Sequence, residues 1–321
     1  MAIHGGAGAL SLTRVPEERI EEMRRDLGVA LDRGLAVLAQ GGSALDAVVS
    51  AVCVLEDSRV FNAGRGAVLR RDRTARLDAS VMSGEDRRAG AVCLVRAAQN
   101  PVLLARAVLG RGREVLLAGE DADRLALELG LVIQPPEYFV TDYRARQLQR
   151  LVEREQMALD HGNVEADPSA GSEPSGEEGQ TVGAVALDAR GHLAAATSTG
   201  GMTNAAPGRV GDSPILGAGT WAHDGTCAVS ATGAGEFFIR AAFAHEVHSR
   251  LMWRGDGIER ATRGALDLVV EMGGHGGCVA IDASGHVVAP FTTLAMPRAY
   301  GRAGGERHVY VLEPSSESPR A

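Results

Sequence analysis

The sequence has few aromatic residues and only four cysteines. Aromatic side chains make up 4% of the 321 residues, and no two cysteines form a Cys-x-x-Cys pair. Each cysteine lies among apolar or small residues, as buried reduced thiols do, at Cys53, Cys93, Cys227 and Cys278. No apolar run is long enough to cross a membrane. We therefore expect reduced, buried cysteines in a protein without a membrane span.

An excess of positive charge is also lacking. The chain has 41 Asp and Glu against 33 Lys and Arg, a formal net charge of −8 at pH 7. This balance disfavours nucleic acid or an anionic membrane as a partner, and a small polar substrate fits better. The chain opens without the charged and apolar segments of a signal peptide. We therefore expect a cytoplasmic protein.

Metal and nucleotide motifs are absent as well. His245 and His248 stand three residues apart on an expected helix, but the sequence offers no third ligand beside them, which argues against zinc. Neither a phosphate-binding loop nor a dinucleotide-binding glycine pattern occurs. Catalysis by such groups is therefore not expected.

Glycine, in contrast, is abundant. The 41 glycines show no period, and together with 45% hydrophobic residues they are typical of layered α/β folds with tight turns. Helical spacing predicts helices over residues 16–40, 101–111, 120–130, 136–158, 236–253 and 256–272, and over 45–55 with Ser43 as the N-cap. Strands are expected at 66–70, 75–80, 89–96, 181–188, 192–197 and 226–231, and in a hairpin over 277–290. These blocks indicate stacked sheets with helices outside.

The composition changes abruptly before residue 181. From residue 162 to 180 Gly, Ser, Pro and Ala dominate, with five acidic residues and no aromatic, Lys or Arg. This composition predicts a flexible linker at about 159–180, which divides the chain into segments 1–180 and 181–321. A buried strand is expected to begin immediately afterwards, so the linker ends at a threonine.

This threonine, Thr181, has the chemistry of a nucleophile. A threonine hydroxyl needs a nearby base to take its proton. If the chain is cut between Gln180 and Thr181, the new α-amine, with a reference pKa of about 7.7–8.0, can accept that proton. One residue would then supply both the nucleophile and the base. Read alone, a threonine that opens a strand commonly reflects β-propensity.

Three further motifs could complete a site. Thr199 lies in a hydroxyl-rich turn with two glycines that permit close approach of a ligand. Arg209 suits a carboxylate and Asp212 an ammonium, so together they fit an amino-acid zwitterion, or else they pair with each other on the surface. Thr232 and Gly233 lie in a glycine-rich strand-to-helix turn of the kind that holds an oxyanion.

These motifs resemble those of the plant-type asparaginase and isoaspartyl peptidase family. Ile3-His-Gly-Gly-Ala-Gly, Phe61-Asn-Ala-Gly-Arg-Gly and Leu77-Asp-Ala-Ser-Val-Met extend the resemblance to nearly the whole chain outside 112–180. The family implies a four-layer αββα sandwich of N-terminal-nucleophile hydrolases, made as one precursor and cleaved into two subunits, here 1–180 and 181–321, that form one folded domain. Two cleaved precursors would pair as an (αβ)2 dimer.

The resemblance also implies residue roles. Thr181 would be the nucleophile, Thr199 a hydroxyl beside it, and Thr232 with Gly233 the oxyanion hole. Asn62, Arg209, Asp212 and Gly235 would contact a β-aspartyl amide, which is either L-asparagine or an isoaspartyl dipeptide. No cofactor is implied for catalysis. A structural sodium would be held by the backbone carbonyls of Leu55, Glu56, Ser58, Phe61, Ala63 and Arg65.

One departure from the family pattern leaves alternatives open. Gln180 stands where the family has a small residue, so its side chain is expected to slow the cleavage before Thr181. A glycosylasparaginase-like hydrolase also uses an N-terminal threonine and an Arg-Val-Gly-Asp-Ser-Pro element. A binding protein for aspartyl ligands that never cleaves itself is the other alternative.

Overall fold

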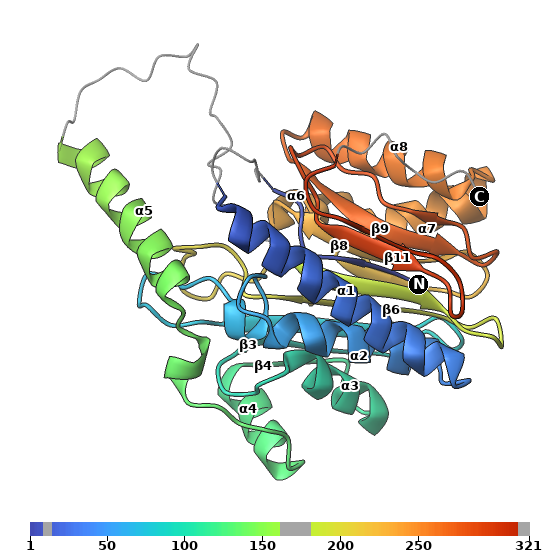
Figure 1. Ribbon diagram of the computed structural model, residues 1–321, viewed down its shortest axis with the longest axis horizontal. Helices are drawn as coiled ribbons and strands as arrows, with labels where there is room; N and C mark the ends of the chain where they lie inside the picture. Colours follow the sequence, from blue (N-terminus) through green and yellow to red (C-terminus); the bar gives the residue numbers. More distant parts are fainter. Residues whose placement is uncertain (9–14, 161–180, 314–321) are drawn as a thin grey trace.

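The computed structural model describes residues 1–8, 15–160 and 181–313, which form a mixed α/β protein with two β-sheets (Figure 1). Gln180 and most of the predicted linker lie outside these residues, and the linker's first two residues instead end helix α5 (Asp142–Asp160). No helix within the described ranges is long and apolar enough to cross a bilayer.

The larger sheet has eight strands in the order β12-β11-β1-β5-β6-β2-β3-β4. They are β1 (Ala2–His4), β2 (Leu77–Ser83), β3 (Ala89–Val95), β4 (Leu116–Ala118), β5 (Val182–Leu187), β6 (Leu193–Thr199), β11 (Arg298–Gly301) and β12 (Arg307–Tyr310). All neighbours pair antiparallel except β3 and β4. Strands from both predicted segments of the chain are thus interleaved in one sheet, with β5 and β6 between β1 and β2.

The smaller sheet comes entirely from the second segment. Its order is β10-β9-β8-β7, with β7 (Thr220–Ala222), β8 (Cys227–Gly233), β9 (Gly276–Asp282) and β10 (Val287–Val288). Helices α6 (Gly235–Ala241), α7 (Phe243–Arg254) and α8 (Ile258–Glu271) follow β8 and precede β9. Of these, α7 contacts β8 and α8 contacts β9.

Helices of the first segment cover the larger sheet. They are α1 (Glu17–Ala39), α2 (Ala44–Asp57), α3 (Pro101–Arg111) and α4 (Gly119–Glu128). The predicted N-cap of α2 is confirmed, since Ser43 Oγ accepts a hydrogen bond from the Asp46 N–H at 3.1 Å. The apolar residues of α2 face both α1 and the strands β5 and β6.

The two sheets contact each other through β5 and β6 on one side and β8 and β9 on the other. In Figure 1, α1 and α2 lie on one side of the sheets and α7 and α8 on the opposite side. Strands β5 and β6 are therefore buried on both faces, by α2 and by β8, and they consist of small and apolar residues. Any polar side chain between the sheets must find its hydrogen bonds there.

Three predicted elements differ from the structure. Residues 66–70 form no strand, because the 3-10 turn η1 (Gly64–Gly66) leads into them and the Val68 N–H donates to the Asn62 side chain. The helix predicted over 236–253 is two helices, since Ala242 has a φ of 46° and ends α6. The helix predicted over 136–158 is the 3-10 turn η2 (Pro136–Phe139) followed by α5. The short strands β11 and β12 were not predicted.

Candidate active site

Two threonines from adjacent strands meet at one end of the larger sheet. Thr181 directly precedes β5, and Thr199 ends its antiparallel neighbour β6. The Thr181 hydroxyl donates to Thr199 Oγ1 at 3.2 Å, and both residues are buried. The Gly201 N–H donates to the same Thr199 oxygen at 3.0 Å, which fixes this hydroxyl in place. The structure thus brings the predicted nucleophile and its predicted neighbour together.

Thr232 and Gly233 lie on the smaller sheet, at the end of β8. The Ala7 N–H donates to Thr232 Oγ1 at 3.1 Å, so the hydroxyl hydrogen remains free for an acceptor in the site. Gly233 has a φ of 153°, and a Cβ there would lie 2.4 Å from the His275 carbonyl oxygen, so only glycine fits. A hydroxyl and a backbone N–H in succession are the donors that an oxyanion requires.

Arg209 is held by a carboxylate that was not predicted. Its Nε and Nη2 donate to the two Glu236 oxygens at 2.9 and 3.1 Å. Asp212 and Gly235 lie beside this pair, since a Cβ at Gly235 would be 2.8 Å from Asp212 Oδ1 and 3.2 Å from Arg209 Nη2. The predicted residues Arg209, Asp212 and Gly235 therefore converge, with Glu236 occupying the guanidinium fork.

Asp212 is a buried carboxyl group with one oxygen that no described residue hydrogen-bonds. It is 3% exposed, and its Oδ2 has no hydrogen-bond partner among the described residues. Burial raises the pKa of Asp212 to about 7, and the nearby carboxylates Glu236 and Asp78 add to this while Arg209 opposes it. A buried carboxyl oxygen without a donor is suited to bind an ammonium group.

Asn62 lies beside the glycine turn that follows Thr199. Its Nδ2 donates to the Gly201 carbonyl at 2.7 Å, and its Oδ1 accepts from the Val68 N–H at 2.8 Å. Its own carbonyl accepts from the Gly200 N–H at 3.0 Å. Asn62 therefore holds the glycine turn that follows Thr199, and both ends of its side chain are occupied.

Comparison with known proteins identifies the family of this chain. An asparaginase family model matches residues 1–311. The chain belongs to the asparaginase family. It is 44% identical to the isoaspartyl peptidase of Escherichia coli K12 over 95% of this chain and 93% of that protein. It is 40% identical to a plant-type L-asparaginase of Pyrobaculum calidifontis, over 96% and 98% of the two chains. It is 38% identical to the isoaspartyl peptidase/L-asparaginase of Mus musculus, over 93% and 86%. The family predicted from the motifs is confirmed.

Backbone carbonyls converge in the loop of this asparaginase-family chain where a sodium was predicted. A Cβ at Gly64 would lie 2.3 Å from the Glu56 carbonyl oxygen. A Cβ at Gly66 would lie 2.1 Å from the Phe61 and 2.9 Å from the Ser58 carbonyl oxygens. No cluster of three or more His, Cys, Asp or Glu that could hold a metal exists in the described part of the chain. A metal held by three or more of these side chains is therefore not expected in this loop.

Sequence reasoning missed two buried charges next to the asparaginase-family site. Arg70 donates from Nη1 to the Ala206 carbonyl at 3.0 Å and from Nη2 to the Arg209 carbonyl at 2.7 Å. Asp78 accepts from the Leu94 N–H at 2.7 Å, and burial raises the pKa of Asp78 to about 6. Arg70 and Asp78 each lie in or next to an apolar segment of the sequence. A charged residue in such a segment is rarely buried without a partner, and this was the available signal.

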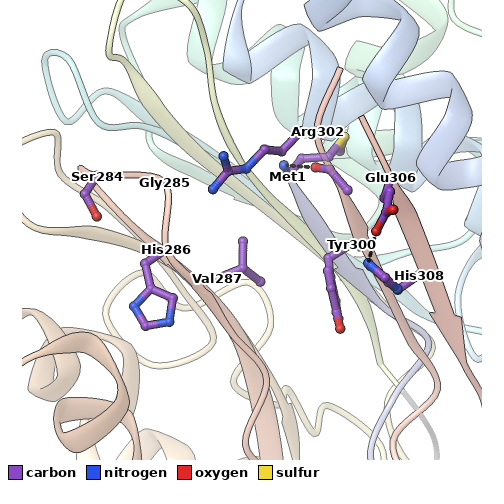
Figure 2. A pocket seen from close by; sticks show the side chains of 10 residues that line it. Met1, Ser284, Gly285, His286, Val287, Tyr300, Arg302, Glu306 and His308 are labelled. Atoms are coloured by element: carbon purple, nitrogen blue, oxygen red, sulfur yellow. Dashed lines mark hydrogen bonds and ion pairs between the residues drawn. The ribbon is translucent and has the colours of Figure 1, made fainter. Parts of the chain in front are cut away.

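A cavity of about 510 Å³ lies away from this site, around the Met1 amine. Figure 2 shows His286 and Val287 on one side of it and Tyr300 and His308 on the other. None of the predicted site residues lines it. The Met1 amine donates to the Gly301 carbonyl at 2.9 Å, and burial lowers the pKa of this amine to about 6. This cavity is therefore not the place where the predicted site residues meet.

Proposed function

We propose that this chain is a self-cleaving amidohydrolase that hydrolyses β-aspartyl amides, both isoaspartyl dipeptides and L-asparagine, with Thr181 as its N-terminal nucleophile. The observation that carries the proposal is the buried contact between the Thr181 and Thr199 hydroxyls at the start of β5. The names of the relatives, isoaspartyl peptidase and L-asparaginase, support the choice of substrate.

Maturation would create the catalytic base. Thr181 Oγ attacks the Gln180 carbonyl carbon, the acyl group moves from nitrogen to oxygen, and water hydrolyses the resulting ester. The products are subunits 1–180 and 181–321, which remain interleaved as one domain in the four-layer αββα sandwich of N-terminal-nucleophile hydrolases. Two such units form an (αβ)2 dimer. The Gln180 side chain makes this step slow.

Hydrolysis would then use the freed α-amine. This amine takes the proton of Thr181 Oγ while the oxygen attacks the side-chain carbonyl of the substrate. The Thr232 hydroxyl and the Gly233 N–H donate to the oxyanion. Ammonia or an amino acid leaves with a proton, and water hydrolyses the acyl-enzyme to release aspartate.

The substrate zwitterion would be held by the charged pair. Arg209 donates to the α-carboxylate, which competes with Glu236 for the guanidinium fork. Asp212 accepts from the α-ammonium, and this positive charge lowers the pKa of Asp212 so that the carboxylate is ionised in the complex. Asn62 acts through the turn that carries Thr199 and Gly201.

A sodium ion would have a structural role. The carbonyls of Leu55, Glu56, Ser58, Phe61, Ala63 and Arg65 would hold it, and the cradle that a Cβ at Gly64 or Gly66 would fill supports this assignment. The ion would fix the loop that carries Asn62. No step of the reaction passes through it.

Hydrolysis assays with three substrates test the proposed function. The matured protein is expected to release leucine from β-aspartyl-leucine and ammonia from L-asparagine, and to leave a glycosylated asparagine intact. Preferred turnover of the glycosylated asparagine would favour the glycosylasparaginase-like alternative. Binding of aspartate without turnover of any amide would favour the non-cleaving binding protein.

A further inference from the structure

A chain of buried polar side chains crosses from one sheet to the other directly beneath the catalytic threonines. We call it the polar row, and it consists of His4, Ser80, Thr197, Thr220 and Ser230. All five residues are fully buried. The proposed mechanism uses none of them, and polar groups between two sheets need a reason because apolar residues would pack there without unmet hydrogen bonds.

Hydrogen bonds connect the polar row without a gap. Ser80 Oγ is hydrogen-bonded to Thr220 Oγ1 at 2.8 Å, and Thr220 Oγ1 is hydrogen-bonded to Thr197 Oγ1 at 2.6 Å. Thr197 Oγ1 bonds Ser230 Oγ at 2.7 Å, and Ser230 Oγ bonds His4 Nε2 at 2.9 Å. The row therefore ties three strands of the larger sheet, β1, β2 and β6, to two strands of the smaller sheet, β7 and β8.

The strand between β1 and β6 has no side chain at this level. Gly183 of β5 pairs with His4 on one side and with Thr197 on the other. A Cβ at Gly183 would lie 1.9 Å from Ser230 Oγ and 2.6 Å from His4 Nε2. The bond between His4 and Ser230 thus passes over the β5 backbone, and any side chain at Gly183 would break it.

Each catalytic threonine lies two residues from a member of the polar row or from Gly183, on the same face of its strand. Thr181 precedes Gly183, Thr199 follows Thr197, and Thr232 follows Ser230. His4 bonds Ser230, and Ala7, which lies further along the chain towards Thr181, bonds Thr232. Because β1 pairs antiparallel with β5, the end of β8 that carries Thr232 lies at the Thr181 end of the larger sheet. The polar row is therefore the layer below the catalytic threonines.

The imidazole of His4 is neutral in this environment. Burial lowers the pKa of His4 to about 3, and the nearby Thr181 backbone, which raises it, only partly offsets the burial. The neutral ring ends the chain of hydroxyls at its Nε2 without adding charge beneath the nucleophile, and its Nδ1 has no hydrogen-bond partner among the described residues. Its proximity to the Thr181 backbone also links the row to the nucleophile itself.

We propose that the polar row positions Thr181 and Thr232, which face each other from two sheets, and that Thr197 and Ser230 are positioning residues for the reaction. The inference rests on the proposed function. Thr197 lies two residues from Thr199 on β6, and the bond of its hydroxyl to the Gly219 carbonyl, at 3.3 Å, is the longest of those that this hydroxyl makes with the described residues, so a break at Thr197 should impair chemistry more than substrate binding. The Ser80 end differs, since Ser80 Oγ also donates to the carbonyl of Ser213, next to Asp212, at 2.6 Å.

The test compares Thr197→Val, which keeps the shape and removes the hydroxyl, with Thr197→Ser, which keeps the hydroxyl. Cleavage of each protein is followed by intact mass during incubation. The value of kcat for β-aspartyl-leucine is then calculated per cleaved chain. Thr197→Val is expected to lower both the cleavage rate and kcat about tenfold with KM within about twofold of wild type. Thr197→Ser should restore kcat, and Ser80→Ala should raise KM instead.

The control is Thr226→Val. Thr226 precedes β8, is buried, and bonds His248 Nδ1 at 2.7 Å, far along the strand from Thr232. Loss of this hydroxyl is expected to lower the melting temperature and leave kcat unchanged. If Thr197→Val also lowers only the melting temperature, the polar row is structural and the inference is overturned. A wild-type protein that hydrolyses no β-aspartyl amide overturns the proposed function, and this inference with it.

Discussion

The two ends of the interface between the sheets differ in the chemical groups that they carry. At one end lie Thr181, Thr199 and Thr232, with the unpartnered oxygen of Asp212 near them. At the other end lies the cavity around Met1, where the amine already donates to the Gly301 carbonyl. Reactive groups with unmet hydrogen bonds mark the first end as the proposed site, and none of the predicted site residues lines the cavity at the second end. Matched substitutions at the two ends can test this contrast.

The largest expected difference is between Thr181→Ala and Ser284→Ala. Thr181→Ala removes the hydroxyl that attacks the Gln180 carbonyl during cleavage and the substrate during hydrolysis, so fragmentation and hydrolysis should both be lost. Ser284, which lines the Met1 cavity, should tolerate alanine with unchanged kcat/KM. The measurement is release of leucine from β-aspartyl-leucine. An active Thr181→Ala protein would place the nucleophile elsewhere.

A large effect on KM is expected from one arginine and none from the other. Arg209→Ala removes the fork that receives the substrate α-carboxylate and should raise KM about 100-fold, since each charge-assisted hydrogen bond contributes about 1.5–3 kcal/mol. Arg302→Ala, at the Met1 cavity, should leave KM as it is. Steady-state kinetics with L-asparagine measure both. An equal change of KM in Arg209→Ala and Arg302→Ala would contradict the assignment of substrate binding to the Thr181 end.

The pH dependence of kcat/KM should report the Asp212 carboxyl. Because burial raises the pKa of Asp212 to about 7 in the free protein, the carboxyl is protonated below this pH and cannot pair with the substrate ammonium. Because the Thr181 amine, with a reference pKa of about 7.7–8.0, must also be deprotonated, we expect kcat/KM to fall more steeply than about tenfold per pH unit below about 7, and Asp212→Asn to keep only the shallower slope that the amine causes. A wild-type slope no steeper than that of Asp212→Asn between about pH 5 and pH 7 would contradict this role of Asp212.

The smallest expected effect comes from freeing Arg209. Glu236→Gln weakens the ion pair that the substrate carboxylate must displace, so KM should fall about threefold. The same change removes a negative charge that raises the pKa of Asp212, so the pH limb should move to lower pH. Glu306→Gln, at the Met1 cavity, is the matched control and should change neither quantity. A higher KM in Glu236→Gln would mean that Glu236 orients Arg209 for the substrate.

Local motifs explain why the family and most site residues could be predicted from the sequence. Thr181, Thr199, Arg209 and Thr232 each lie in a short motif whose glycines and hydroxyls indicate a turn beside a strand. The helix beginning after Ser43 could be predicted because its cap is also local.

Long-range pairings explain what could not be predicted. Glu236 meets Arg209 across 27 residues, and His4 meets Ser230 across 226, so neither pairing leaves a mark on the local pattern. Residues 66–70 looked like a strand because they are apolar, although Asn62 and not another strand takes the Val68 N–H. The sodium, the (αβ)2 dimer and the cytoplasmic location stay predictions.

Intact mass spectrometry during incubation at neutral pH tests the central claim most directly. Wild type is expected to convert slowly into two fragments that meet between Gln180 and Thr181, with hydrolytic activity rising in proportion, while Thr181→Ala stays whole. A wild-type chain that hydrolyses β-aspartyl amides at full rate without being cut would contradict the claim that the amine of Thr181 is the catalytic base.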